Sequence, residues 1–221
     1  MNSNHNITAA IFDLDGLMID SERHSFQILR EYAAEFGIAF TEENYKWLIG
    51  QDTKKSGIYL NEEIGIPVDP DEIMDEHWDR LTEVIAEKAR PLPGLYELIE
   101  ALQARKLSLA IASNSRLPYV ERALEAIHLQ DAFQCVLSGQ ELGKSKPEPD
   151  VYLHTAACLG VSPSGCLVLE DSPTGLEAAL AAGMRAVVVP NPDLQEEDFN
   201  GAFARFYSLE EVVANLDRLL T

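Results

Sequence analysis

Short apolar runs separated by amphipathic stretches dominate the hydrophobic pattern of this chain. Each run is apolar almost throughout, and the stretches that separate the runs from residue 94 onward have apolar positions at helical spacing. Strands that are hydrophobic on both faces are typical of a parallel sheet with helices on each side, so we predict an α/β fold. The predicted strands lie within residues 8–15, 107–113, 133–139, 166–171 and 185–191, and the predicted helices within 95–105, 118–128, 150–160, 174–182 and 208–220.

Residues 21–89 contain no convincing strand and have helical periodicity instead. Four helices are predicted there, within residues 21–36, 42–49, 52–64 and 70–89. A right-handed crossover between parallel strands needs only one helix, so we interpret this segment as an inserted α-helical domain. The core then consists of residues 1–20 and 90–221. The edges of the insert are marked by Asp20-Ser21, which suits a helix cap, and by "RPLPG" (90–94), a stiff return linker.

The amino-acid composition limits the kinds of partner that the protein can bind. The chain has 221 residues, is 46% hydrophobic and can bury a full core, but its formal net charge is −20. Nucleic acid and anionic membrane surfaces both require a basic patch, so we expect neither as a partner. A protein this acidic that handles an anionic substrate needs a local positive centre, such as a metal ion.

The cysteines and the N-terminus bear on location. Cys135, Cys158 and Cys166 match no metal-ligand spacing and lie in apolar or Ala-rich runs, so we expect three core thiols in a reducing compartment. The first six residues, MNSNHN, contain no apolar signal region, and no run approaches the roughly 20 apolar residues of a membrane span. We therefore expect a cytoplasmic protein.

Polar residues follow three of the predicted strands at the point where each strand ends. They are Asp13 and Asp15 after the first strand, Ser113-Asn114-Ser115 after the second and Glu170-Asp171 after the fourth. The carboxyl ends of parallel strands lie at one edge of a sheet, where ligands bind, so we expect these groups to converge. Carboxylates that gather in one place repel one another unless a cation compensates. Because Mg2+ prefers such oxygen ligands, the pattern predicts a Mg2+ site.

A basic group comes from "GKSKPEPD" (143–150), which contains Lys144 and Lys146. The overlapping stretch "SGQELGKS" (138–145) imitates a phosphate-binding P-loop. Ser138 stands where that motif needs its first glycine, however, and the prolines that follow Lys144 prevent a helix from opening there. "DLDG" (13–16) begins like a calcium loop but lacks the later acidic positions. We reject both interpretations.

Four motifs, in this order along the chain, resemble the haloacid dehalogenase superfamily, specifically its phosphatases and phosphomutases of the β-phosphoglucomutase type. The motifs are "FDLDG" (12–16), "ASN" (112–114), "KPEPD" (146–150) and "LEDS" (169–172). The resemblance covers nearly the whole chain, and residues 21–89 look like the helical cap of that subfamily. It implies a Rossmann-like parallel sheet core with an inserted α-helical cap domain.

The resemblance also implies catalytic roles. Asp13 matches the family's nucleophile, which forms an aspartyl-phosphate intermediate, and Asp15 matches its general acid/base. Lys146 matches the catalytic lysine, with Lys144 as the alternative.

Substrate and metal contacts are implied in the same way. Ser113 and the backbone amide of Asn114 match the phosphate-binding motif. In the family the Mg2+ ion is held by side chains from the first and last motifs and by one backbone carbonyl. The corresponding residues here are Asp13, Asp15 through its backbone carbonyl, Glu170 and Asp171.

The leading hypothesis is a Mg2+-dependent phosphatase that acts on a small phosphorylated metabolite, such as a sugar or sugar-alcohol phosphate. Asp15 argues against dehalogenases and phosphonoacetaldehyde hydrolases, which carry other residues at that place. A sugar phosphomutase is the alternative. The cap histidine of such mutases falls on Ser25 here, and His24 stands one position early, about 100° around a helix. A receiver-like signalling domain is a further alternative, although receivers lack a helical insert.

The cap is expected to select the substrate. The loop around "IGQDTKKS" (49–56) should reach over the cleft, because Gly50 begins a polar tract between two predicted helices. Lys54 and Lys55 would meet a second anionic group or sugar hydroxyls there, or would remain solvated. We expect the protein to act as a monomer.

Overall fold

The structure, a computed structural model, describes residues 6–191, 194–195 and 197–221, so the predicted polar start of the chain lies outside it except for residue 6. Its centre is a six-stranded parallel sheet in the order β3-β2-β1-β4-β5-β6. The strands are β1 (Ala9–Phe12), β2 (Ser108–Ser113), β3 (Cys135–Ser138), β4 (Cys166–Glu170), β5 (Arg185–Val188) and β6 (Ala204–Arg205). The first five strands lie within the predicted apolar runs, and the predicted fold class is confirmed.

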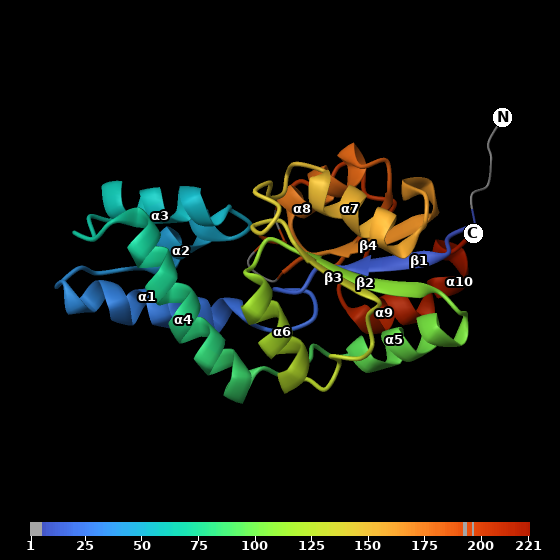
Figure 1. Cartoon of the computed structure of the whole chain (residues 1–221), viewed down its shortest axis with the longest axis horizontal. Coiled ribbons are helices and arrows are strands. Elements are labelled where there is room, and N and C mark those ends of the chain that lie inside the picture. Colours follow the sequence, from blue (N-terminus) through green and yellow to red (C-terminus); the bar gives the residue numbers. More distant parts are fainter. Residues whose placement is uncertain (1–5, 192–193, 196) are drawn as a thin grey trace.

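Helices cover both faces of the sheet, which explains why its strands are apolar throughout. Successive residues of β1 point to opposite faces: Ala10 and Phe12 join one hydrophobic cluster, and Ala9 and Ile11 join the other. The first cluster includes α5 (Leu95–Ala104), α6 (Leu117–Ala126), α9 (Leu209–Ala214) and α10 (Leu216–Leu219). The second includes α7 (Asp150–Leu159) and α8 (Pro173–Ala181), which lie across the sheet from α5 and α9 in Figure 1.

A separate helical lobe lies beside the sheet (Figure 1). Its helices are α1 (Glu22–Glu35), α2 (Glu42–Leu48), α3 (Thr53–Glu62) and α4 (Pro70–Lys88). They enclose a third hydrophobic cluster of their own, which includes Leu29, Leu60 and Ile73. The starts of α3 and α4 follow from the sequence, because the side chains of Asp52 and Asp69 accept backbone hydrogen bonds there.

The two connections between the lobe and the sheet run side by side. The Leu92 N–H donates to the Met18 carbonyl at 2.8 Å, and Ile19 forms an antiparallel bridge with Pro91. Ser21 precedes α1 as predicted, but its side chain makes no capping hydrogen bond. The two segments that connect the lobe to the core therefore pair with each other and form one narrow strip, made of Met18, Ile19, Pro91 and Leu92.

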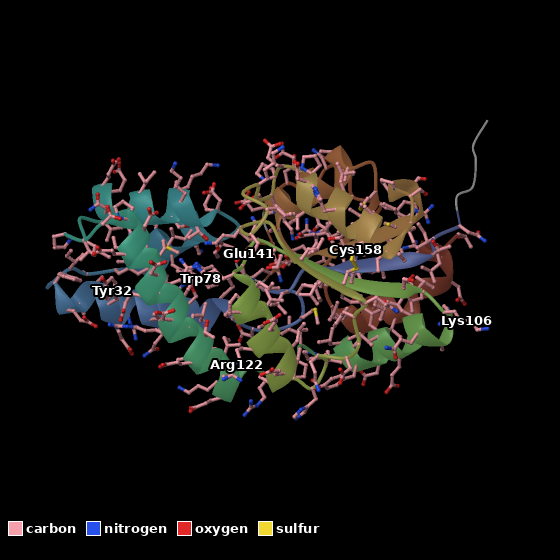
Figure 2. All side chains as sticks on the ribbon, in the orientation of Figure 1. Tyr32, Trp78, Lys106, Arg122, Glu141 and Cys158 are labelled. Atoms are coloured by element: carbon pink, nitrogen blue, oxygen red, sulfur yellow. A yellow bond between two sulfur atoms is a disulfide. The ribbon has the colours of Figure 1, made fainter. Side chains whose placement is uncertain are left out.

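The lobe also contacts the core through α4 and α6. The rings of Trp78 and Tyr119 meet edge to face with centroids 5.2 Å apart, and Arg116 at the start of α6 forms an ion pair with Asp75 of α4. Figure 2 shows Trp78 on α4, on the side that faces α6. The lobe is thus held against the core at a second place, away from the connecting strip.

Two features near the C-terminus differ from the sequence prediction. The short edge strand β6 was not predicted, because two residues are too few to produce a recognisable apolar run. The single helix predicted over residues 208–220 is wrong: α9 ends at Ala214, Asn215 interrupts the helix, and α10 begins at Leu216. No helix in the described part of the chain has the length and apolar character needed to cross a membrane.

The cysteine prediction was also wrong for two of the three residues. Cys135 of β3 and Cys158 of α7 form a disulfide, with their Cα atoms 6.4 Å apart (Figure 2), and only Cys166 is a buried free thiol. The two cysteines are 23 residues apart in the sequence, a separation that does not by itself predict a disulfide. The pair forms because α7 packs directly over β3, which is a property of the tertiary fold.

Candidate active site

Neighbouring strands end at the same edge of the sheet and bring polar side chains together there. β1 lies between β2 and β4, and Asp13 extends the pairing by donating its backbone N–H to the Leu169 carbonyl at 3.0 Å. Ser113 and Glu170 are the last residues of β2 and β4. The polar residues buried at this edge include Asp13, Ser113, Lys146, Glu170 and Asp171. The predicted convergence is therefore present.

Lys146 is enclosed by two carboxylates and an aromatic ring. Its Nζ donates to Oδ1 of Asp13 at 2.5 Å and to Oε1 of Glu170 at 2.6 Å, and it lies 4.9 Å from the centre of the Tyr152 ring. Lys144, the alternative lysine, is exposed and pairs with Asp150 at 2.9 Å. Of the two candidates, Lys146 is the one that contacts Asp13.

Burial sets the electrostatics of this cluster. It raises the pKa of Asp13 to about 8, because the repulsion from Glu170 and Asp15 adds to desolvation and the attraction of Lys146 does not offset both. Burial, Asp13 and Glu170 likewise raise the pKa of Asp171 well above its usual range. Burial alone would lower the pKa of Lys146, but Asp13 and Glu170 outweigh it and raise that pKa. The cluster as described carries too little positive charge for its carboxylates.

Glu170 is fixed by several hydrogen bonds. Its Oε1 also accepts from the Tyr152 hydroxyl at 2.5 Å, and its Oε2 accepts from the backbone N–H groups of Asp171 and Ser172. The start of α8 passes so close that a Cβ on Gly175 would lie 1.9 Å from the Glu170 carboxyl carbon. Glu170 therefore has little freedom to move.

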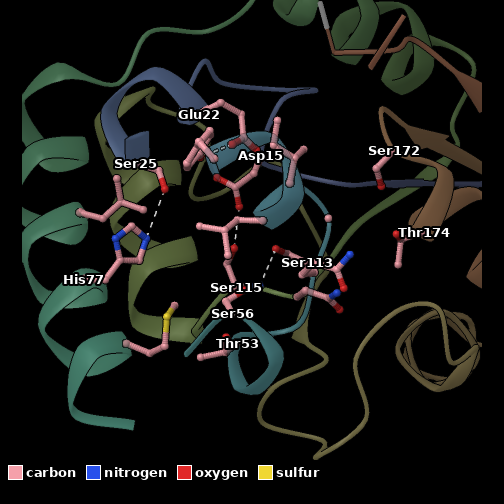
Figure 3. A pocket seen from close by; sticks show the side chains of 18 of the residues that line it. Asp15, Glu22, Ser25, Thr53, Ser56, His77, Ser113, Ser115, Ser172 and Thr174 are labelled. Atoms are coloured by element: carbon pink, nitrogen blue, oxygen red, sulfur yellow. Dashed lines mark hydrogen bonds between the residues drawn. The ribbon is translucent and has the colours of Figure 1, made fainter. Parts of the chain in front are cut away.

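Asp15 lies in a different environment from Asp13. Ser115 Oγ donates to one of its carboxylate oxygens at 2.6 Å (Figure 3), and the Tyr119 hydroxyl donates to the other at 2.5 Å. Sequence analysis missed both partners. Ser115 belonged to the quoted Ser-Asn-Ser tract and could have been considered, whereas Tyr119 on α6 gave no signal.

Ser113 and Asn114 organise the loops of the site. Ser113 Oγ accepts from the Ser115 backbone N–H at 3.0 Å. The Asn114 side chain accepts from the Lys146 backbone N–H at 2.8 Å and donates to the Lys146 carbonyl at 3.4 Å. The Asn114 side chain therefore holds the backbone that carries Lys146, a contact that sequence analysis did not foresee.

A cavity of about 140 Å³ lies between this edge of the sheet and the helical lobe. On the core side it is lined by Asp13, Asp15, Ser113, Asn114, Ser115, Lys146, Asp171, Ser172 and Thr174. Glu170 does not line it. Figure 3 shows Ser113 and Ser115 on one side of this space and Ser25 and His77 on the other.

The lobe contributes the remaining walls. Of the predicted selector loop 49–56, Ile49, Gly50, Gln51, Thr53 and Ser56 line the cavity. Lys54 and Lys55 do not; they are exposed and line a separate neighbouring groove, where Lys55 pairs with Asp52 at 3.2 Å. Ser25 lines the cavity, and His24 does not.

The donor set fits a divalent metal ion. Asp13, Glu170 and Asp171 each offer a carboxylate oxygen, and these oxygens lie within 4.8 Å of one another. Buried carboxylates with raised pKa values are the arrangement that a cation would compensate, and binding of the ion would release their protons. Asp15 is not part of this cluster of carboxylate oxygens.

Known proteins resemble this chain over most of its length. Residues 10–189 match a family described as "Haloacid dehalogenase-like hydrolase". The chain is 34% identical to hexitol phosphatase B of Escherichia coli K12 over 221 residues, covering 97% of this chain and 98% of that one. It is 34% identical to protein CbbY of Rhodobacter capsulatus, covering 89% and 91%.

A solved structure agrees with this relationship. The crystal structure of CbbY from Rhodobacter sphaeroides in complex with phosphate has a TM-score of 0.86 and 29% identity to this chain, covering 96% of this chain and 99% of that one. The sequence motifs, the fold and the strand-end cluster are all consistent with it. The chain therefore belongs to the haloacid dehalogenase-like hydrolase family.

Proposed function

We propose that this protein is a Mg2+-dependent phosphatase that hydrolyses a small phosphorylated metabolite through an aspartyl-phosphate on Asp13. The observation that carries the proposal is that Asp13, Asp15 and Lys146 line one cavity between the core and the helical lobe. Similarity to hexitol phosphatase B over 97% of the chain supports a sugar or sugar-alcohol phosphate as the substrate. We expect the enzyme to act as a monomer.

The metal ion would be held by the carboxylates of Asp13, Glu170 and Asp171, which fit it, and by the backbone carbonyl of Asp15. When bound, Mg2+ would stabilise negative charge on the phosphoryl oxygens. Glu170 also holds Lys146 in place, which keeps a second positive charge beside Asp13. The charges of Mg2+ and Lys146 would together supply the positive potential that this acidic protein needs to bind a phosphate group.

In the first step a carboxylate oxygen of Asp13 attacks phosphorus, and the ester P–O bond breaks. Asp15 gives its proton to the leaving oxygen, so the alcohol departs neutral. Lys146 holds the Asp13 carboxylate in position, and Ser113 with the Asn114 backbone amide would bind the phosphoryl oxygens. This division assigns bond formation to one aspartate and proton transfer to the other.

In the second step water attacks phosphorus while Asp15 takes its proton, and the bond between Asp13 and phosphorus breaks to release inorganic phosphate. The contacts that Asp15 receives from Ser115 and Tyr119 hold its carboxylate beside the cavity. A positioned acid/base of this kind contributes roughly 10²–10⁴-fold in rate. Removing it should therefore slow turnover without removing the nucleophile.

Residues 21–89 would act as a cap that closes over the substrate. The cavity of about 140 Å³ is smaller than typical ligand sites of roughly 300–1,000 Å³. The cap must therefore move away to admit a sugar phosphate and then close to exclude water. The narrow strip formed by Met18, Ile19, Pro91 and Leu92 is the place where it would hinge.

Sugar phosphomutase activity is the alternative, and the described lining of the cavity does not favour it. His24 does not line the cavity, and the position where such mutases carry a histidine is Ser25. A mutase would return an isomeric sugar phosphate, whereas a phosphatase would release inorganic phosphate. Membership of a hydrolase family argues against the receiver-like alternative.

The experiment is a phosphate-release assay on a panel of sugar, sugar-alcohol and aryl phosphates, with Mg2+ and with a chelator. The Asp13→Asn variant should lose at least about 10³-fold in kcat, as expected for loss of a nucleophile. Acid-quenched wild-type enzyme should yield a phosphorylated peptide that contains Asp13. Turnover that persists in Asp13→Asn, or with the chelator present, would contradict the proposal.

A further inference from the structure

The cap side of the cavity carries no positive charge among the residues that the structure describes. Lys146, on the core side, is the only lysine or arginine in the described lining. The lobe contributes apolar side chains such as Leu29 and Leu81, and neutral polar ones such as Gln51 and Ser56. Its one acid in the lining is Glu22, whose carboxylate accepts a hydrogen bond from the Tyr45 hydroxyl.

Ser25 and His77 form a polar pair within this wall. The Ser25 hydroxyl and Nε2 of His77 are 3.3 Å apart, and the two side chains point toward each other in Figure 3. His77 is only 5% exposed, and its Nδ1 has no hydrogen-bond partner in the described part of the chain. The Nε1 of Trp78, which also lines the cavity, is without a partner in the same sense. Buried polar atoms of this kind are costly unless a ligand or water satisfies them.

The imidazole of His77 stays neutral at ordinary pH. Burial lowers the pKa of His77 to about 4, and the positive charge of Arg116 acts in the same direction. The wall therefore presents neutral groups that can both donate and accept hydrogen bonds. Such groups match sugar hydroxyls, and they would leave a second anionic group without a cationic partner next to Glu22.

The neighbouring groove does not supply the missing charge. Besides Lys146, it contains Lys54, Lys55, Arg116 and Lys144, and all of these except Lys54 already have acidic partners. The pairs are Lys55–Asp52, Arg116–Asp75 and Lys144–Asp150. A second phosphate or a carboxylate that reached this groove would have to compete with those partners at every one of these cations except the exposed Lys54.

We propose that the cap wall selects substrates whose body is uncharged and rich in hydroxyl groups, that His77 and Ser25 contact these hydroxyls, and that the wall rejects a second anionic group. The proposal rests on the proposed phosphatase function and narrows its substrate class to monophosphates of neutral polyols or sugars. His77 and Ser25 thus become specificity-determining residues.

The test compares two matched probes with an aryl phosphate in the presence of Mg2+. Glucitol 6-phosphate and 6-phosphogluconate share one carbon chain and differ only in a terminal hydroxymethyl or carboxylate group. The wild-type kcat/KM should favour glucitol 6-phosphate by about 100-fold, because the carboxylate would be buried without a partner. Equal values for the two probes, zero included, overturn the proposal if the aryl phosphate is still hydrolysed.

Substitutions of Ser25 and His77 test whether these two residues determine the substrate selectivity. Ser25→Lys adds a cation to the wall at a half-buried site. It should reduce the kcat/KM ratio of glucitol 6-phosphate to 6-phosphogluconate at least about tenfold. His77→Gln and Ser25→Ala should lower kcat/KM for glucitol 6-phosphate by about tenfold, and by less for the aryl phosphate, as expected for lost hydrogen bonds. Equal losses of kcat/KM on glucitol 6-phosphate and on the aryl phosphate would show that His77 and Ser25 have only structural roles. That result would overturn their assignment as specificity-determining residues.

Lys54→Gln is the matched control, since Lys54 lies outside the cavity, and it should leave both sugar-derived probes unchanged. If it lowers activity on 6-phosphogluconate, the groove recognises the anion and the proposal is wrong. Absence of phosphate release from every compound, the aryl phosphate included, would instead refute the proposed phosphatase function. The two failures are therefore distinguishable.

Discussion

Two aspartates that are only two positions apart have different surroundings. Asp13 is buried against Lys146, whereas both carboxylate oxygens of Asp15 accept hydrogen bonds from hydroxyl groups of the core. The carboxylate oxygens of Asp13, Glu170 and Asp171 cluster without that of Asp15. At the scale of single residues, these contacts separate a residue that would bind metal through its side chain from one that would not.

This separation predicts different outcomes for two similar substitutions. Asp171→Asn should weaken Mg2+ binding by at least about tenfold, because it removes a charged ligand from the cluster. Asp15→Asn should bind Mg2+ almost as well as the wild type while losing about 10²–10⁴-fold in kcat. Calorimetric titration of both variants with Mg2+ makes the comparison. If Asp15→Asn lost the ion as thoroughly as Asp171→Asn, the assignment of roles would be wrong.

His77 predicts a pH dependence of stability. Its pKa is about 4 in the folded protein and near 6.5 when unfolded. A lowered pKa means that the unfolded chain binds the proton more tightly. The stabilising contribution is therefore fully present above pH 6.5 and is lost as the pH falls toward 4, by on the order of 3 kcal/mol.

The measurement is the free energy of unfolding at pH 7 and at pH 4.5 from urea titrations. His77→Gln should lose less stability than the wild type between these two values. His154→Gln, at an exposed position on α7, serves as the control and should follow the wild type. Identical pH dependence in all three proteins would contradict the inferred state of His77.

At the scale of elements, the start of α8 depends on a close approach to the end of β4. The Ser172 side chain caps the helix by accepting from the Gly175 N–H at 3.1 Å, and the same hydroxyl donates to Glu170 at 3.2 Å. Gly175 lies against the Glu170 carboxylate, which several hydrogen bonds hold in place. A side chain at Gly175 would force the two apart.

Gly175→Ala should therefore destabilise the protein by about 1–3 kcal/mol, the usual cost of overpacking a filled core. It should also lower kcat, because a displaced Glu170 no longer holds Lys146. Thermal unfolding and phosphate release measure the two effects. Glu177→Ala, at an exposed position of the same helix, should change stability by less than about 0.5 kcal/mol. A fully active, stable Gly175→Ala would show that Glu170 can shift freely.

At the scale of the whole molecule, the cavity exists only where the lobe meets the core. The loop that begins at Gly50 lies close to the core: a Cβ on Gly50 would lie 3.2 Å from the Thr174 hydroxyl, and Thr53 donates to Gln140 at 3.4 Å. The backbone of Gly50 has a φ of 76°, which favours glycine. Gly50 thus appears where the loop must turn and approach the core closely, while Gln51 lines the cavity beside it.

These two neighbours should respond differently to alanine. Gly50→Ala strains the turn and crowds Thr174, so it should impair closure and lower kcat/KM for sugar and aryl phosphates alike. Gln51→Ala removes a cavity contact, so it should lower kcat/KM about tenfold for a sugar phosphate and less for an aryl phosphate. Steady-state kinetics on both substrates decides between these effects. Loss of both activities in Gln51→Ala would assign it to closure instead of selection.

Much of the fold and of the site follows from local patterns. Apolar runs identify five of the six strands, and the helical periodicity of residues 21–89 identifies the lobe, because burial of strands and helices leaves a period in the sequence. The strand-end positions of Asp13, Ser113 and Glu170 predict that they meet, since parallel strands share one carboxyl edge. β6 and the break at Asn215 were missed because short elements leave too few periodic positions.

Contacts between distant segments were decided only by the tertiary structure. The sequence by itself determined which segments form the buried strands and where the carboxylates gather, because those features follow from period and strand direction. It did not determine that Tyr119 contacts Asp15, that Cys135 meets Cys158, or that His77 faces the cavity while Lys54 lies outside it. A period reports that a helix face is buried but not what it is buried against, and the relative rotation and distance of packed elements decide that.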